Sequence, residues 1–227
     1  MASSGESVPL GVAGQPQPAG APAPEPPAVR RQRGVRGLSI AAHLLAGATT
    51  FFFAGFLFAY FYLRSLDVDH MWKPAHVKPD QALGAAFVAC IVLSAALAIV
   101  AGRRERASAS WVGAASASLL LGLVAVALQC IEFTTQGFGP TNGAFASVFC
   151  AWLAFYLIAV LGTMYWLEIQ VATELRERRE PTARPGEGVI TYEHPDRLLP
   201  RGLDAAVFYW GFLAGIGVVS YVILYLL

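Results

Sequence analysis

Histidines that could bind a heme are scarce in this sequence. The chain has four, of which only His43 lies within a long apolar segment, while His194 lies in a basic loop. A heme held by two histidines needs both of them as axial ligands, and a single intramembrane histidine cannot supply both. A b-type cytochrome or another membrane enzyme that uses His43 is therefore a minor alternative.

A group of possible metal ligands lies in the first long loop between apolar segments. The side chains gathered there are His70, His76, Asp67, Asp69 and Asp80. These residue types can hold a surface metal ion, but solvated histidines and aspartates are also ordinary in loops. We favour ordinary loop polarity and expect this chain to bind no metal and no cofactor.

The three cysteines offer no better site. Cys90, Cys130 and Cys150 fall in three different apolar segments and lack C-x-x-C spacing. A copper site needs a matching set of soft ligands, and none accompanies them. Buried cysteines commonly behave as small apolar residues, so we expect neither a copper site nor a disulfide.

Carboxylates at membrane depth are the remaining candidates, because an unpaired ionisable group in a bilayer is costly. Glu132 lies near the end of the third apolar segment, and Gln129 shares its face if the segment is helical. Two interpretations of Glu132 remain open: a solvated position at the interface, or a capping or interhelical contact with the loop at residues 134–142. We hypothesise that the pair fixes this end of the span, so that Glu132→Gln weakens assembly. Glu168, near the end of the fourth segment, is expected to be solvated.

The elements that must position these residues are membrane helices. Hydrophobic residues form 56% of the chain and charged residues only 14%, which is far from the balance of a soluble domain. About 20 apolar residues cross a bilayer as a helix, and five segments qualify: residues 38–63, 83–101, 111–131, 144–167 and 203–227. The sequence predicts an all-α, polytopic bundle of five transmembrane helices.

The distribution of Lys and Arg predicts the orientation, because positively charged loops remain cytoplasmic. One side of the predicted topology carries most of them: Arg30, Arg31, Arg33, Arg36, Arg103, Arg104, Arg106, Arg176, Arg178, Arg179, Arg184, Arg197 and Arg201. The other side has only Arg64, Lys73 and Lys78. We expect a cytoplasmic N-terminus and an external C-terminus. Topology accounts for the arginines and the net charge is only +1, so we expect no nucleic-acid partner.

The polar parts of the chain lie outside these spans. Residues 1–37 are predicted to be a disordered cytoplasmic tail rich in Pro and Ala, because the stretch lacks an apolar period. Residues 38–227 form the membrane domain, with a basic cytoplasmic loop at residues 170–202 that is too short to build its own core. No signal-peptide pattern precedes the first span.

Small residues spaced four apart predict close helix packing, which is a main source of helix association in lipid. The pairs are Gly55 and Ala59, Gly113 and Ala117, Ser118 and Gly122, and Gly211 and Gly215. We expect most of them to pack within this chain's own bundle and leave open that a fraction faces another subunit.

Three stretches carry a family signature. The first span contains Phe52, Phe53, Gly55, Tyr60 and Arg64 and is followed by Trp72. The next stretch contains Gln129, Glu132, Ser147 and Phe149, and the last span contains Tyr209, Trp210 and Phe212. In that order, they resemble three motifs of heme-copper oxidase subunit III. The first is F-F-A-G-F with A-Y-F and Arg, the second is L-Q-x-x-E-[YF] with G-x-[YF]-x-S-x-F, and the third is Y-W-H-F. The resemblance covers residues from about 39 to 227 and matches five-helix bacterial members.

The departures from that family fall on its intramembrane polar residues. Thr49 stands where the family has a buried acid, Tyr156 and Ala159 replace two histidines, Gly211 replaces the histidine of Y-W-H-F, and Ala214 replaces an aspartate. The packing residues of the family are kept. These losses argue against a proton-handling role through those acids.

The resemblance implies a non-catalytic structural subunit of a respiratory terminal oxidase in the bacterial inner membrane. Family members stabilise the catalytic subunit and bind phospholipids, so the expected partners are oxidase subunits I and II, which carry the heme and copper. An accessory subunit of a nitric oxide reductase is an alternative. A small membrane transporter is an alternative of another class, although the spans lack mid-helix prolines and detectable repeats.

Overall fold

Helices form all the regular secondary structure of the part of the chain that the structure describes. The computed structural model describes residues 27–67, 72–179 and 202–227. Its α-helices are α1 (Pro27–Ser65), α2 (Gln81–Arg106), α3 (Val112–Thr135), α4 (Ala144–Arg179) and α5 (Leu203–Tyr221), and a π-helical C-terminal segment (Val222–Leu226) follows α5.

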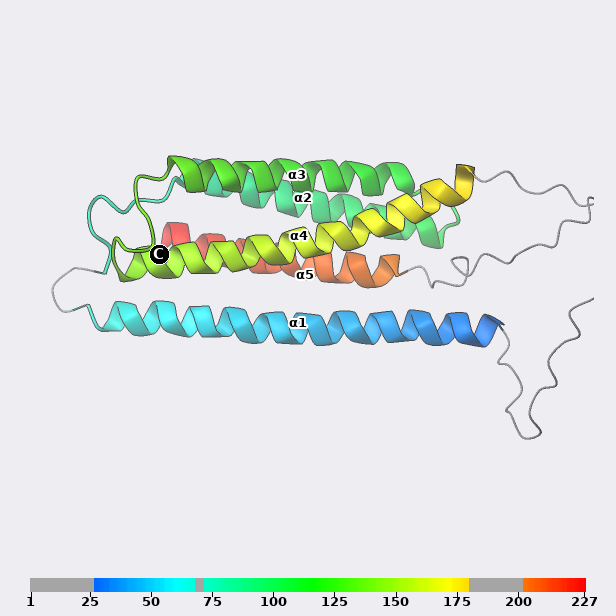
Figure 1. The fold of residues 1–227 in the computed structure, drawn as a ribbon, viewed down its shortest axis with the longest axis horizontal. Helices are drawn as coiled ribbons and strands as arrows, with labels where there is room; N and C mark the ends of the chain where they lie inside the picture. The colour runs from blue at the N-terminus through cyan, green and yellow to red at the C-terminus, as the bar shows by residue number, and fades with distance from the viewer. Residues whose placement is uncertain (1–26, 68–71, 180–201) are drawn as a thin grey trace, which may run out of the picture.

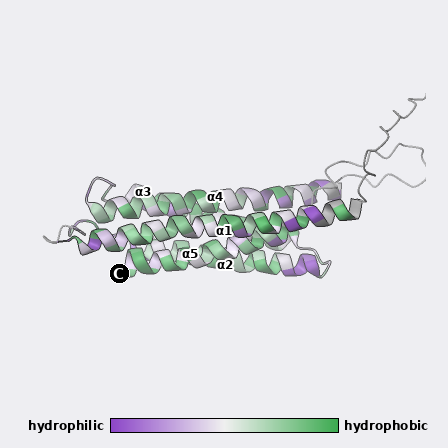
Figure 2. Ribbon diagram, turned by 90° about the horizontal axis from the view of Figure 1, so that it is seen from below, coloured by the Kyte–Doolittle hydropathy of each residue, from purple (hydrophilic) through white to green (hydrophobic). Residues whose placement is uncertain are grey.

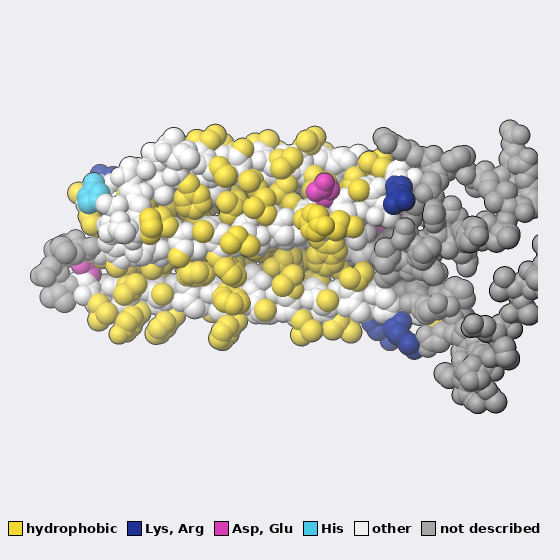
Figure 3. All heavy atoms as spheres, viewed as in Figure 1, with side chains coloured by type: hydrophobic (Ala, Val, Ile, Leu, Met, Phe, Trp, Pro, Cys, Tyr) yellow, Lys and Arg dark blue, Asp and Glu magenta, His cyan; other side chains and the backbone are white. Residues whose placement is uncertain are grey.

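Five of these helices are long and apolar enough to cross a membrane. The 24-residue α3 is about 36 Å long at the usual rise per residue, which exceeds the roughly 30 Å of a bilayer's hydrocarbon. α5 is shorter, but together with the π-helical segment it forms a span of 24 residues, Leu203–Leu226. Hydrophilic residues gather at the helix ends (Figure 2), and hydrophobic side chains cover the helices on the face shown in Figure 3. The chain is a multi-pass membrane protein, as the composition predicts.

The helices alternate in direction, and four of them form a ring. α2 packs on α3, α3 on α4, α4 on α5, and α5 on α2, whereas α1 lies outside the ring against α4 and α5 (Figure 1). α1 is accordingly the least buried of the five spans. Because the number of spans is odd, α1 begins at one end of the bundle and the chain ends at the other.

Two helices extend beyond their predicted bounds. α1 begins at Pro27, so residues 27–37 are helical and not part of a disordered tail; proline is well suited to the first helical turn because its missing N–H is not needed there. The tail predicted for residues 1–26 lies outside the described residues.

α4 continues to Arg179, through the first part of the loop predicted at residues 170–202. This extension consists largely of good helix formers, and Arg178 bonds Glu174 at 3.0 Å with i,i+4 spacing. The rest of that loop, residues 180–201, lies outside the described residues.

Only one of the predicted small-residue pairs lies at a close helix approach. Gly55, Gly113 and Gly215 are exposed, and a Cβ at any of them would contact nothing. Of the predicted pairs, Ser118 and Gly122 are both buried, and Gly122 faces Met164 and Trp210. The expectation for the exposed pairs was wrong because lipid and core are both apolar, so small-residue spacing does not reveal which face of a helix is buried.

The loop between α1 and α2 is fixed to the bundle by aromatic residues. Trp72 is buried with Tyr60 and Phe145 in edge-to-face contacts, and its carbonyl accepts a hydrogen bond from the Phe145 amide at 3.2 Å. The Asp67 carboxylate accepts a bond from the Trp72 amide at 3.1 Å. This loop thereby joins the end of α1 to the start of α4.

Candidate functional site

The most deeply buried carboxyl group joins α3 to the C-terminal segment. Glu132 is 1% exposed, and the Tyr225 hydroxyl donates to its Oε1 at 2.7 Å and its Oε2 at 2.8 Å. The Gln129 amide donates to Oε2 at 3.0 Å, which confirms that the two side chains share a helix face. Together these contacts satisfy a carboxyl group that would be costly to bury alone.

The surroundings of Tyr225 hold its hydroxyl in place. Its ring packs on Phe149 at 5.5 Å between centroids, and its backbone carbonyl accepts a bond from the Gln81 side chain at 3.0 Å. Gly84 leaves the room for the ring, since a Cβ there would lie 2.5 Å from Tyr225 Cε1. The cluster of Gln129, Glu132 and Tyr225, here called the C-terminal polar cluster, therefore rests on α2, α3 and α4.

Both interpretations left open for Glu132 were wrong. The side chain is not solvated, and its partner is the end of the chain and not the loop at residues 134–142. Tyr225 was missed because nothing in an apolar C-terminal stretch singles out one tyrosine. The i,i+4 spacing of Tyr221 and Tyr225 indicated only that the two tyrosines share a helix face. Glu168 is exposed on α4, and its expected solvation stays a prediction.

A second buried polar group joins α2, α3 and α5. The Ser94 hydroxyl donates to the Ser118 carbonyl at 2.7 Å, and the Ser118 hydroxyl donates to the Ser94 carbonyl at 2.8 Å. The Trp210 indole N–H donates to the Ser94 hydroxyl oxygen at 3.0 Å. All three residues are at most 2% exposed. The reciprocal pair brings two backbones close, and such bonds strengthen helix association in lipid.

Hydrogen bonds also join α5 to α1 and α4. The hydroxyls of Thr49 and Tyr209 lie 2.7 Å apart, and the Tyr156 hydroxyl donates to the Leu213 carbonyl at 2.8 Å. The Trp152 indole donates to Ser220 at 2.8 Å. Two positions at which the chain departs from the oxidase pattern, Thr49 and Tyr156, thus form neutral helix-to-helix hydrogen bonds.

The other substituted positions carry no polar side chain. Ala214 is buried, whereas Ala159 and Gly211 are half-buried. A Cβ at Gly211 would contact nothing, so this glycine is not required by close packing within the chain.

The remaining motif residues divide between the core and the surface. Phe53 is buried against Trp152, with ring centroids 5.9 Å apart, and half-buried Phe212 stacks on Tyr209. Phe52 and Arg64 are exposed. Ser147 is exposed and bonds the carbonyls of Pro140 and Gly143, which fixes the loop before α4.

The possible metal and heme ligands are scattered. His43 is exposed, bonds the Ser39 carbonyl and stacks on Phe208 at 4.2 Å. Within the described ranges no group of three or more His, Cys, Asp or Glu side chains could hold a metal ion, and the three cysteines are free. Asp80 accepts the amides of Ala82 and Leu83 as the N-cap of α2. Asp69, His70 and His194 lie outside the described residues.

No protein-family model and no curated protein sequence matches the chain. The chemistry of the site is therefore considered from its own residues. The buried polar side chains described above donate to and accept from one another, mostly between helices, which suits them to hold a bundle together.

Proposed function

We propose that this chain is a non-catalytic, cofactor-free subunit of a respiratory heme-copper terminal oxidase, similar to subunit III. It stabilises the catalytic subunit, contacts subunits I and II, and binds phospholipid in the bacterial inner membrane, with its N-terminus cytoplasmic and its C-terminus external. The heme and copper belong to the partner subunits.

One observation carries the proposal. Gln129 and Glu132, the polar pair of the stretch that resembles the oxidase family, are buried and hydrogen-bonded within the bundle. A polar pair that is enclosed in this way supports a structural role for the motif. The neutral bonds of Thr49 and Tyr156 support the same role.

The outer face of α1 is the part of the bundle best suited to contact a partner subunit. Phe51 is 80% exposed and Phe58 is 70% exposed, and the Phe58 ring stacks on exposed Tyr62. Aromatic side chains supply large contact areas at low entropic cost. This face remains available because α1 packs on the bundle mainly through α4 and α5.

Affinity purification from native membranes tests the proposal. The full chain carries an N-terminal tag and is extracted in mild detergent. The measurements are mass spectrometry of the co-purifying proteins and a reduced-minus-oxidised heme spectrum. We expect a heme-bearing catalytic subunit to co-purify, and deletion of the coding sequence to lower the amount of assembled oxidase. An equally tagged unrelated polytopic protein is the control. Recovery of this chain without any heme-bearing oxidase subunit would overturn the proposal.

A further inference from the structure

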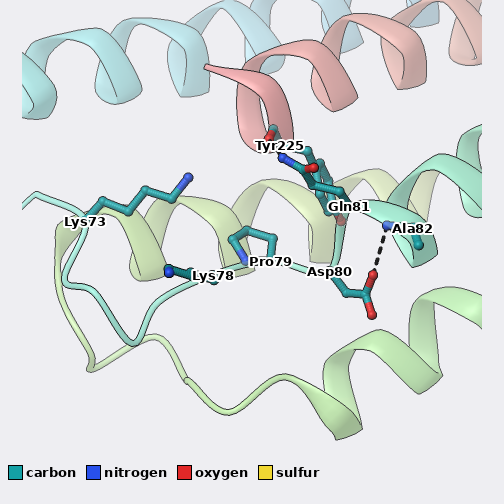
Figure 4. Close-up of a pocket in the computed structure, with 7 residues that line it drawn as sticks. All are labelled: Lys73, Lys78, Pro79, Asp80, Gln81, Ala82 and Tyr225. Atoms are coloured by element: carbon teal, nitrogen blue, oxygen red, sulfur yellow. Dashed lines mark hydrogen bonds between the residues drawn. The ribbon is translucent and has the colours of Figure 1, made fainter.

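An open hollow lies at the end of the bundle where the C-terminal segment meets the start of α2. Its volume is about 540 Å³, and its lining residues are Lys73, Lys78, Pro79, Asp80, Gln81, Ala82 and Tyr225 (Figure 4). Three parts of the chain build it: the α1–α2 loop, the first turn of α2 and the last turn of the chain.

The hollow concentrates the basic groups of this end of the bundle. Lys73 and Lys78 both line it, and neither forms an ion pair within the described residues. Burial and the positive charge of Arg64 lower the pKa of Lys73 below the ordinary value for lysine. Burial is the larger of the two causes, so the Lys73 ammonium is partly withdrawn from water at the hollow.

The other polar side chains of the lining form hydrogen bonds within the chain, and the Asp80 carboxylate is the one acidic group among them. Asp80 Oδ1 accepts the amides of Ala82 and Leu83, the Gln81 amide donates to the Tyr225 carbonyl, and the Tyr225 hydroxyl donates to Glu132. The Lys73 ammonium lies 4.5 Å from the centre of the Phe145 ring, which fixes its position without neutralising its charge. The two ammonium groups therefore remain the donors available to a ligand.

The depth of the hollow limits what such a ligand can be. Its lining lies at the end of one candidate span, Gln81–Arg106, and near the end of another, Leu203–Leu226. The ends of transmembrane helices lie among the lipid headgroups, where the long side chains of lysine can reach lipid phosphates. Phosphate groups are the anions found at this depth.

We propose that the hollow binds the phosphate of an anionic phospholipid headgroup, with Lys73 and Lys78 as its cationic ligands. This inference rests on the phospholipid binding of the proposed function and gives it a site, but it requires only that the chain spans a bilayer and not that it belongs to an oxidase. Pro79 and Tyr225 contribute to the wall against which the headgroup rests.

Native mass spectrometry of the purified full chain tests this inference. The protein is incubated with equimolar phosphatidylglycerol and phosphatidylcholine, and the bound ratio is measured for the wild type and for a Lys73→Gln/Lys78→Gln variant. We expect the wild type to prefer phosphatidylglycerol and the variant to lose about tenfold or more of that preference, because each basic residue near an anionic headgroup contributes measurably to binding.

A matched control removes the same charge elsewhere. The variant Arg103→Gln/Arg104→Gln changes two exposed residues at the other end of α2, and we expect it to keep the wild-type preference. No preference in the wild type, or an equal loss in both variants, would overturn the proposal. A competition arm separates the sources of phosphate: displacement of phosphatidylglycerol by millimolar inorganic phosphate would overturn the assignment to a lipid. The wild-type measurement remains decisive even if the lysine variant misfolds.

Discussion

Glu132 shows how a carboxyl group can be placed inside a membrane bundle without a basic partner. Its two oxygens accept three short contacts from two neutral side chains, and one of these belongs to a residue 93 positions further along the chain. An acceptor that loses its donors in a dry site is left unsatisfied, and the cost falls on the stability of the fold. The tyrosine is therefore as important to this end of the bundle as the carboxyl group.

Removal of the Tyr225 hydroxyl tests this directly. Tyr225→Phe keeps the ring on Phe149 but removes the donor to both Glu132 oxygens, and we expect a loss of about 1–3 kcal/mol in the free energy of unfolding. Thermal unfolding in detergent measures this loss as a lower midpoint temperature. Glu132→Gln is expected to shift the midpoint in the same direction. Tyr165→Phe is the control, because Tyr165 is 65% exposed on α4. Equal midpoints for Tyr225→Phe and Tyr165→Phe would mean that the bond adds no stability.

At the scale of elements, the four-helix ring and α1 differ in how they are held. The ring contains reciprocal serine bonds and close glycine contacts, whereas α1 contacts it through a narrow row of buried residues: Ala42, Ala46, Thr49, Phe53 and Tyr60. Glycines matter where helices approach closely, and Gly84 on α2 is such a position because Tyr225 lies against it. The motif glycine Gly55 on α1 has no such contact within the chain.

Substitution of alanine for these two glycines should therefore affect the stability of the fold differently. Gly84→Ala places a methyl group against the Tyr225 ring and should cost about 1–3 kcal/mol, as overpacking does. Gly55→Ala meets nothing, so stability should be unchanged or higher by up to about 1 kcal/mol, since alanine favours a helix. Thermal unfolding of the two variants side by side gives the comparison. A stable Gly84→Ala protein would show that α2 and the C-terminal segment can separate without cost.

At the scale of the whole molecule, charge is distributed unevenly between the two ends. Because the helices alternate in direction, the start of α1 and the ends of α2 and α4 lie at the same end of the bundle. The basic residues there are Arg33, Arg36, Arg103, Arg104, Arg106, Arg176 and Arg178. The other end carries Arg64, Lys73 and Lys78. Under the positive-inside rule this asymmetry favours the proposed orientation, with the N-terminus in the cytoplasm.

Reporter fusions in a bacterial host test that orientation. A C-terminal alkaline phosphatase, which folds only outside the cytoplasm, should be active, and a C-terminal green fluorescent protein should be dark. An N-terminal fluorescent fusion should be bright. Fusion of the phosphatase after Arg179 serves as the matched control and should be inactive, because α4 ends on the opposite side from α5. Active phosphatase after Arg179 together with inactive phosphatase at the C-terminus would reverse the assigned orientation.

Hydropathy alone predicted five helices that are long and apolar enough to cross a membrane, because the hydrocarbon thickness imposes both a length and an apolar composition on each span. The pairing of Gln129 with Glu132 also followed from sequence, since it depends only on helical spacing. Only the tertiary structure decided which residues meet across helices, such as Ser94 with Trp210 and Glu132 with Tyr225. The physical reason is that lipid and protein core are both apolar, so a membrane helix lacks the polar stripe that would mark its outer face in water. The rotation of each helix, and with it the partner of each buried polar group, is fixed only when the helices pack.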